Sequence, residues 1–449
     1  MACWACGLFP VDTGLTGNIA NRMFALSKTM PMLNFLRKNH YPPGTYTSAH
    51  PCLSRLSVAV LVLGGGAFSL PAAAAFSDTI APFVATSYSY DDNLFRLPDN
   101  SPGFDGARSD TSRQVQAGFL VNRPIGRQLL TGQMKWSRVS FDHFDQLNYN
   151  GKDYLADLEW HIANHLEGHA GASYAQTLTP FNDLRTTDRN LRVVRREYAN
   201  GTWRFHPRWR VRGGFTRERY TYDSIAQRYA DRSENATELG VDYLAPSDSR
   251  IGLQLRHLKG GFPNRADLNF SGIEQGYEQD EVKANIYWRF SGVTQLQLLG
   301  GWVKRKNQVF SGRDSSGANG RAIMYWAPLG KVRFTASLWH EFAAVENSLI
   351  TSSLNNGASL AAAWDISAKV RMDAQVRREK RDFSAASGLV LPGDISDSTR
   401  TASLGVTYAP RPNIQLGISA FRDARSGAPI INTGSFRAKG ISFNASAQF

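Results

Sequence analysis

Cysteine is nearly absent from this sequence, and its few occurrences lie at one end. The 449 residues include three cysteines, Cys3, Cys6 and Cys52. A disulfide-stapled secreted domain would keep its cysteines, and a Cys-ligated metal site would need them. The sequence after residue 75 therefore excludes both classes. A chain that crosses an oxidising compartment in an unfolded state is also safer without thiols.

Long apolar runs are equally scarce. Mean hydropathy is -0.34 and 20% of the residues are charged, which excludes a helical membrane protein, because each span needs about 20 apolar residues. One apolar run, Leu56 to Leu70, follows Arg55 and precedes the small residues Ala72 to Ala75. This order is typical of a signal peptide. We therefore expect residues 51–75 to be removed by cleavage near Ala75, leaving residues 76–449 as one domain.

Residues 1–50 lie upstream of this signal and fit no part of it. We interpret them as a wrongly assigned N-terminal extension or a disordered segment, with Met23, Met30 or Met32 as alternative starts. The remaining alternative is an unusually long region before the signal's apolar run.

Acidic residues are outnumbered, with 38 Asp and Glu against 51 Lys and Arg. Removing residues 1–75 takes away five basic residues and one acidic residue, so the mature chain stays basic. A basic excess predicts anionic partners, such as lipopolysaccharide phosphates or an acidic glycan. Secretion argues against nucleic acid as a partner.

Helical periodicity is missing from residue 79 onward, and short runs with apolar and polar residues in alternation take its place. Runs of about ten alternating residues are typical of transmembrane barrel strands, because lipid-facing and lumen-facing side chains must alternate. We predict an all-β chain that forms a single antiparallel up-and-down transmembrane barrel of about 18 strands, with 16 as the alternative. The predicted strands are 79–90, 111–123, 127–141, 152–162, 166–177, 191–205, 208–222, 234–245, 249–258, 279–290, 293–305, 320–327, 330–343, 357–366, 368–383, 399–408, 412–423 and 436–449.

The connections between these strands alternate in length. Short ones such as His206-Pro207 and Ser291-Gly292 supply turn dihedrals, and longer ones such as Asp91 to Asp110 lie between them. Barrels of the outer membrane have short periplasmic turns and longer external loops. An even strand count also places both ends of the barrel on the periplasmic side.

Two faces can be distinguished within single strands. In the last strand, Ile441, Phe443, Ala445, Ala447 and Phe449 alternate with Ser442, Asn444, Ser446 and Gln448. A terminal aromatic preceded by alternate apolar residues resembles the signal by which barrels are recognised for insertion, so Ile441, Phe443 and Phe449 are its candidates. It predicts the barrel-assembly machinery and outer-membrane lipid as partners.

Charged residues on the other face must point into the lumen, because Lys or Arg facing lipid at mid-bilayer costs about 2 to 4 kcal/mol. One interpretation is that these charges pair across strands and keep the interior hydrated. The other is a path of weak sites in which guanidinium groups hold the anionic groups of a passing polymer. The lumen candidates are Arg196, Arg204, Arg210, Arg212, Arg256, Arg289, Arg333, Arg371, Arg377, Asp153, Asp157, Glu159, Glu238 and Asp242.

Three further patterns contain residues of the types that bind metal ions or catalyse reactions. His161, His165 and His169 straddle a predicted hairpin, where Glu167 and Glu159 would face the first and last of them, so pairing is favoured over a metal site. Asp91, Asp92, Asn93 and Asp99 lack the spacing of a calcium loop and predict a solvated loop. Asp142, His143 and Asp145 could serve a hydrolase, but no Gly-x-Ser-x-Gly accompanies them. We expect no enzyme activity, metal or cofactor.

The segment Ala75 to Phe83, followed by Tyr88-Ser89-Tyr90-Asp91-Asp92-Asn93-Leu94-Phe95-Arg96, resembles the opening of EpsL-type outer-membrane proteins of exosortase-associated exopolysaccharide clusters. The specific likeness is confined to this segment. It implies a barrel in the biosynthesis or export of an extracellular polysaccharide, with polysaccharide-export components of the periplasm and inner membrane as partners. The alternatives are a general diffusion porin for small hydrophilic solutes and a structural or adhesive surface barrel.

Overall fold

The computed structural model describes residues 79–449 except 183–184, 266–274, 309–313, 345–349, 386–394 and 428–433. The expected extension, the signal peptide, its cleavage site near Ala75 and the three cysteines lie outside the described residues. Two short 3-10 segments, η2 (Asp145–Leu147) and η3 (Ile225–Ala230), interrupt a fold made otherwise of strands. In the described part of the chain, no helix has the length and apolarity of a membrane span.

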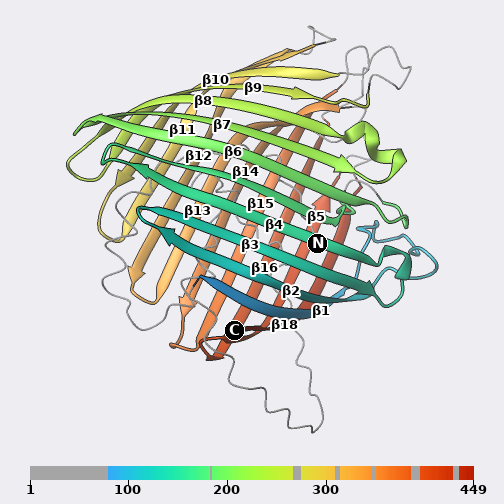
Figure 1. The fold of residues 1–449 in the computed structure, drawn as a ribbon. Coiled ribbons are helices and arrows are strands. Elements are labelled where there is room, and N and C mark those ends of the chain that lie inside the picture. Colours follow the sequence, from blue (N-terminus) through green and yellow to red (C-terminus); the bar gives the residue numbers. More distant parts are fainter. Residues whose placement is uncertain are drawn as a thin grey trace.

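The eighteen strands form one closed antiparallel sheet, as the sequence predicts. Each strand pairs with its neighbours in sequence, and β1 also pairs with β18, which rules out the 16-strand alternative. Figure 1 shows β2 to β8 crossing the near wall and β13 to β18 crossing the far wall at a steep angle to them. The strands are β1 Ile80–Asp91, β2 Asp110–Ile125, β3 Gln128–Phe141, β4 Tyr149–Ile162, β5 Leu166–Leu178, β6 Leu191–His206, β7 Trp209–Tyr222, β8 Arg232–Leu244, β9 Arg250–Gly261, β10 Gly276–Arg289, β11 Thr294–Asn307, β12 Ser315–Leu329, β13 Val332–Ala344, β14 Ile350–Asp365, β15 Val370–Ala385, β16 Ser396–Arg411, β17 Ile414–Ser426 and β18 Phe436–Gln448.

The two ends of the barrel differ in their connections. The tight turns, such as those after β2 and β6, all lie at one end, which we call the turn end. The longer connections, including both 3-10 segments, lie at the other, the loop end. Phe83 of β1 faces Gln448 of β18, so both ends of the barrel sequence lie at the turn end. The predicted alternation of connections and the shared side of the two ends are confirmed.

Two of the predicted strands begin several residues too late at the loop end. β12 begins at Ser315 and β14 at Ile350, where the alternating pattern predicts 320 and 357. The added residues are mostly Ser, Gly and Asn, so they carry little alternation in hydropathy. Backbone pairing continues there because a sheet needs only hydrogen bonds between strands, whereas the sequence pattern reports the contrast between two environments.

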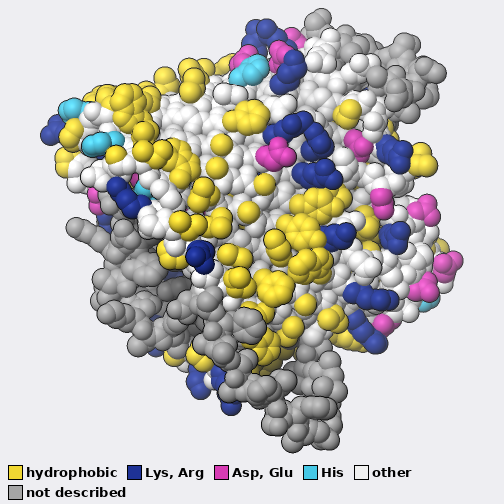
Figure 2. Space-filling view, viewed as in Figure 1, with side chains coloured by type: hydrophobic (Ala, Val, Ile, Leu, Met, Phe, Trp, Pro, Cys, Tyr) yellow, Lys and Arg dark blue, Asp and Glu magenta, His cyan; other side chains and the backbone are white. Residues whose placement is uncertain are grey.

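The outer wall is apolar and the inner wall is polar. In β10, Val282 and Trp288 are about half exposed, whereas Glu281, Lys283 and Asn285 between them are buried. In β18, Ile441 and Phe443 are exposed and Ser442 is buried, and Phe449 directly after the strand is exposed as well. Figure 2 shows the apolar side chains as a band across the near wall. Exposed aromatic residues gather toward the turn end, among them Trp203, Trp209, Trp288, Trp326 and Trp364.

The connection between β1 and β2 is packed, so the prediction of a solvated loop there is wrong. The Asn93 side chain donates to the Leu97 and Arg437 carbonyls over 2.8 Å each, and Arg96 pairs with Asp91 at 2.9 Å. Phe95 is fully buried and meets Phe144 and other rings edge to face. A group of residues from three loop-end connections and the adjoining strands forms this loop-end cap: Leu94, Phe95, Leu97, Val139, Phe141, Phe144, Leu147 and Phe181.

Candidate functional site: the charged lumen wall

The inner faces of the strands carry the candidate site. Side chains alternate along each strand, so the polar residues between exposed apolar ones point into the barrel. The structure places every predicted lumen residue at such an inward position. Most of them form ion pairs there, and we call this inner surface the lumen wall.

One cluster of the lumen wall is centred on Asp242, which is fully buried. Its carboxylate accepts from Arg210 Nε at 2.9 Å and from Arg212 Nε at 3.3 Å. Arg250 Nε lies 3.9 Å away. These residues come from β7, β8 and β9, and register brings them together, since Arg210 faces Asp242 directly. One carboxylate thus serves three guanidinium groups, and the cluster keeps a positive excess.

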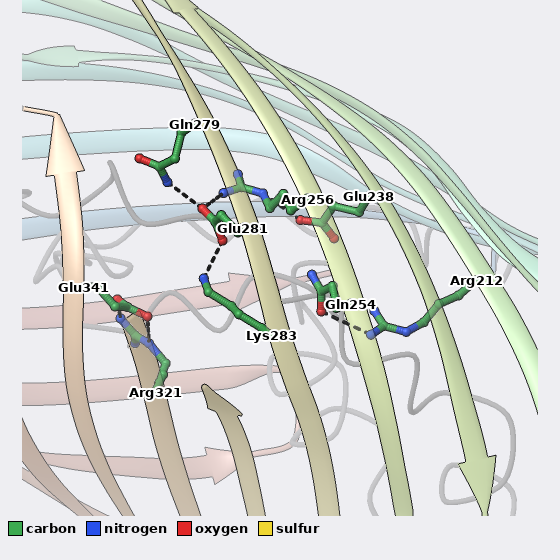
Figure 3. A network of polar contacts seen from close by, with 9 residues as sticks. All are labelled: Arg212, Glu238, Gln254, Arg256, Gln279, Glu281, Lys283, Arg321 and Glu341. Carbon is green, nitrogen blue, oxygen red and sulfur yellow. Dashed lines mark hydrogen bonds and ion pairs between the residues drawn. The ribbon is translucent and has the colours of Figure 1, made fainter. Parts of the chain in front are cut away.

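A second cluster joins β8, β9 and β10 and is drawn in Figure 3. Arg256 lies between two carboxylates, 2.8 Å from Glu238 and 2.9 Å from Glu281. Glu281 also accepts from Lys283 and Gln279, each at 2.5 Å. All five side chains are buried. The chain of contacts runs across three strands, so the charges hold one another in fixed positions.

The part of the wall formed by β12 to β15 is organised by an aromatic ring. Trp339 of β13 lies under Arg377, whose guanidinium carbon is 4.3 Å from the ring centroid. Glu379 accepts from Trp339 Nε1 at 2.9 Å and from Arg377 at 2.5 Å. Next to them, Arg321 and Glu341 form a two-pronged pair at 3.0 and 2.6 Å, the geometry favoured by guanidinium and carboxylate.

Three other ion pairs of the lumen wall near the turn end are more exposed. Arg333 lies 2.8 Å from Asp365, with about a third of each side chain exposed. Arg371 pairs with Asp373 at 2.5 Å, and Arg289 pairs with Asp248 at 2.6 Å. At the loop end Arg381 and Arg425 share Asp397, and all three are buried. The lumen charges are therefore buried at the loop end, whereas at the turn end these partly exposed pairs occur together with the buried Asp242 cluster.

The β4–β6 part of the wall carries the remaining predicted residues. Asp157 accepts from Tyr198 at 2.5 Å and lies 3.0 Å from the His169 ring. Arg196 lies 3.4 Å from Glu218, and the Asp153 carboxylate is 2.8 Å from Lys135. Arg204 points inward near the turn end, and among the described residues no carboxylate lies within ion-pair distance of it.

The histidine hairpin has the predicted register, with Glu159 facing His169 and His161 facing Glu167. The contacts differ in one respect: the His169 ring meets Asp157 rather than Glu159, because Asp157 is buried beside it. His161 lies 3.6 Å from Glu159. Within the described ranges, no three His, Cys, Asp or Glu side chains are grouped to hold a metal ion.

Asp142, His143 and Asp145 belong to a loop that is fixed through its backbone. The Asp110 carboxylate accepts from the backbone N–H groups of Asp142, His143 and Phe144. The Asp142 side chain pairs with Arg113 at 3.3 Å on the outside of the barrel. The structure thus gives this segment an architectural role and brings no acid and base of it to a common point.

The inward direction predicted for the lumen arginines agrees with the structure, but the prediction omitted several other charged residues of the lumen wall. Glu218, Arg250, Arg305 and Arg321 share the inward parity of the predicted residues, so the two-residue period could have identified them. Asp397 lies outside the predicted strand 399–408, and Arg96 lies in a connection. Their inward positions depend on contacts with distant strands, which no local pattern reports.

No protein-family model and no curated protein matches the sequence. Among solved structures the chain is similar to the outer membrane protein OpdK of Pseudomonas aeruginosa, with 12% identity, a TM-score of 0.45 and coverage of 83% of this chain and 99% of that one. It is similar to OccAB3 of Acinetobacter baumannii, with 9% identity, a TM-score of 0.44 and coverage of 83% and 100%. For OccK5 of Pseudomonas aeruginosa the values are 12%, 0.44, 84% and 100%.

Proposed function

We propose that this chain is an outer-membrane barrel that passes hydrophilic solutes through its lumen. The observation that carries the proposal is the reversal of polarity between the two walls: apolar residues cover the outside and ion-paired residues line the inside. An apolar outside suits hydrocarbon, and closure leaves no unpaired strand edge. The turn end then faces the periplasm and the loop end faces outward.

The lumen favours charged or strongly polar solutes of either sign. Carboxylates lie next to most of the lumen arginines, as at Asp242, Glu281 and Glu341. The wall therefore presents paired positive and negative charges to a solute, rather than a row of positive charges alone. Several weak contacts let a solute enter and leave, whereas one tight site would hold it. The pairing interpretation of the lumen charges fits this geometry better than a path for anions alone.

Passage can be tested with the purified barrel in planar bilayers. We expect stepwise conductance in simple salts and weak discrimination between small anions and cations. A control with the loop-end cap opened by Arg96→Gln should conduct at least as well as the unaltered protein. A barrel that inserts in vesicles, shown by its faster gel mobility before heating, yet carries no current with or without the cap would contradict the proposal.

A role in exopolysaccharide secretion is the second candidate, and the segment from Tyr88 to Arg96 favours it through its resemblance to EpsL-type proteins. In the proposed orientation, the turn end is the side on which a periplasmic polymer would arrive. Deletion of the gene followed by measurement of cell-associated and released polysaccharide separates the two candidates. Unchanged polysaccharide together with channel conductance leaves the diffusion function alone.

A further inference from the structure

Charges on the outer wall gather at one end of the barrel. Outward-facing Lys and Arg within the strands lie mainly in the loop-end half: Arg113, Arg138, Lys152, Arg195, Arg219, Lys304, Arg378, Arg400, Arg422 and Lys439 among them. Near the turn end, Arg123 and Arg411 are the outward-facing strand arginines in the described residues. Figure 2 shows the blue side chains gathered toward the right-hand end of the near wall, where the β7–β8 connection lies.

The register places like charges side by side in this half. Arg378 of β15 faces Arg400 of β16, and Arg422 of β17 faces Lys439 of β18. Side chains directly opposite on one face have Cβ atoms about 5 Å apart, and like charges in such pairs destabilise a sheet. Among the described residues no carboxylate lies within ion-pair distance of these four cations, whose side chains are exposed. We call Arg378, Arg400, Arg422 and Lys439 the cationic cluster.

The cationic cluster lies next to the apolar band. On the same four strands, the exposed apolar residues Val376, Leu404, Ile418 and Ile441 lie one or two outward positions closer to the turn end. A ligand seated here would meet cations with one part and hydrocarbon-facing side chains with the next. A phosphorylated lipid has both parts, whereas a free anion would use the cations alone.

The opposite arc of the wall repeats the arrangement. Arg195 of β6 faces Arg219 of β7, and the Arg195 guanidinium carbon lies 5.5 Å from the Tyr174 ring centroid. By contrast, the loop-end charges of β9 and β10 neutralise each other, with Lys259 3.2 Å from Glu278. The uncompensated positive charge thus follows particular strands, as expected for sites and not for a uniform solubilising rim.

We propose that the cationic cluster binds the phosphate groups of an outer-leaflet glycolipid of the lipid A class. The inference rests on the proposed outer-membrane location and concerns the outside of the barrel, so bilayer conductance and lipid binding can fail separately. Guanidinium groups bind phosphate through paired N–H donors. The lipid phosphate would supply the counter-charge that the facing pairs of cations lack.

The test compares the double variant Arg378→Gln/Arg400→Gln with the matched control Arg123→Gln/Arg411→Gln at the turn end. Binding of diphosphorylated lipid A and of dephosphorylated lipid A to the refolded protein is measured in detergent micelles. Each arginine near an anionic surface contributes about fivefold in affinity. We therefore expect about twentyfold weaker binding of the phosphorylated lipid by the cluster variant and less than about twofold change in the control.

Unchanged binding by a cluster variant that keeps its folded gel mobility overturns the proposal, as does equal affinity for the two lipids. Displacement of the lipid by millimolar inorganic phosphate would show a site for free anions and overturn the assignment to a lipid headgroup. A barrel that conducts ions but fails these binding tests leaves the proposed function standing.

Discussion

The loop-end cap offers a sharp test of the buried ion pair between Asp91 and Arg96. The Arg96 guanidinium is 1% exposed and lies 2.9 Å from the Asp91 carboxylate, so both charges are held away from water. Removing one partner of a buried pair costs about 3 to 5 kcal/mol, because the other charge stays without compensation. We therefore expect Arg96→Gln to destabilise the packed conformation of residues 92–109, relative to an open one, by about this amount.

Cleavage by an unspecific protease measures how often this connection opens. When opening is fast, the cleavage rate follows the population of the open form, and about 3 kcal/mol corresponds to roughly a hundredfold. We expect Arg96→Gln to raise cleavage within residues 92–109 by about that factor. Mass spectrometry of the fragments locates the cut.

Two further variants make the reasoning refutable. Arg108→Gln removes an exposed donor to the Asp99 carbonyl in the same loop and should raise cleavage by less than about threefold, since exposed contacts contribute little. Asp91→Asn/Arg96→Gln should be cleaved more slowly than the sum of its single changes predicts, because it leaves no lone charge. Additive effects of Asp91→Asn and Arg96→Gln would show that the two charges are not coupled, and the argument would be wrong.

Three other predictions follow from the lumen and the barrel end. Asp242→Asn removes the negative charge with which Arg210 and Arg212 pair, so denaturant titration should show a loss of about 3 to 5 kcal/mol in the free energy of unfolding. Reversal potentials should shift toward anions, and an unchanged reversal potential would contradict a lumen role. Gly357→Ala places a Cβ 2.1 Å from the Trp339 ring, and overpacking should lower the free energy of unfolding by about 1 to 3 kcal/mol, with Gly357→Ser losing at least as much. Phe449→Ala should reduce the amount of inserted barrel in membrane fractions while the refolded protein keeps its stability in vitro, and normal insertion would contradict a signal role.

The strands were predictable because their two faces meet opposite surroundings. In β10, Val282 and Trp288 alternate with Glu281 and Lys283, and the structure exposes the first pair and buries the second. The pattern fails where both faces are polar, which is why Ser315 and Ile350 lie beyond the predicted starts of their strands. The parity of the strands therefore indicated which face points inward, while the loop-side starts of β12 and β14 were missed.

The partners of the lumen charges were harder to predict than their direction. Pairing depends on register and on rotamers, so Arg256 could be placed inward but not between Glu238 and Glu281. The cap was missed for a related reason. The Asn93 side chain donates to the carbonyl of Arg437, which is 344 residues away in the sequence. No residue close to Asn93 in the sequence indicates that contact. A polar segment between two strands is therefore predicted to be exposed to solvent unless the distant residues that cover it are known.

The pairing of β1 with β18, which closes the barrel, constrains how the barrel assembles. Ser89 and Ser442 hydrogen-bond across it at 2.6 Å although 353 residues separate them. The first strand therefore has no partner on that side until synthesis and delivery of the whole chain are complete, and until then its backbone groups remain available to any other strand they meet. Assembly of this barrel must accordingly pass through an open chain, in which the first and last strands each keep one unpaired edge until they meet.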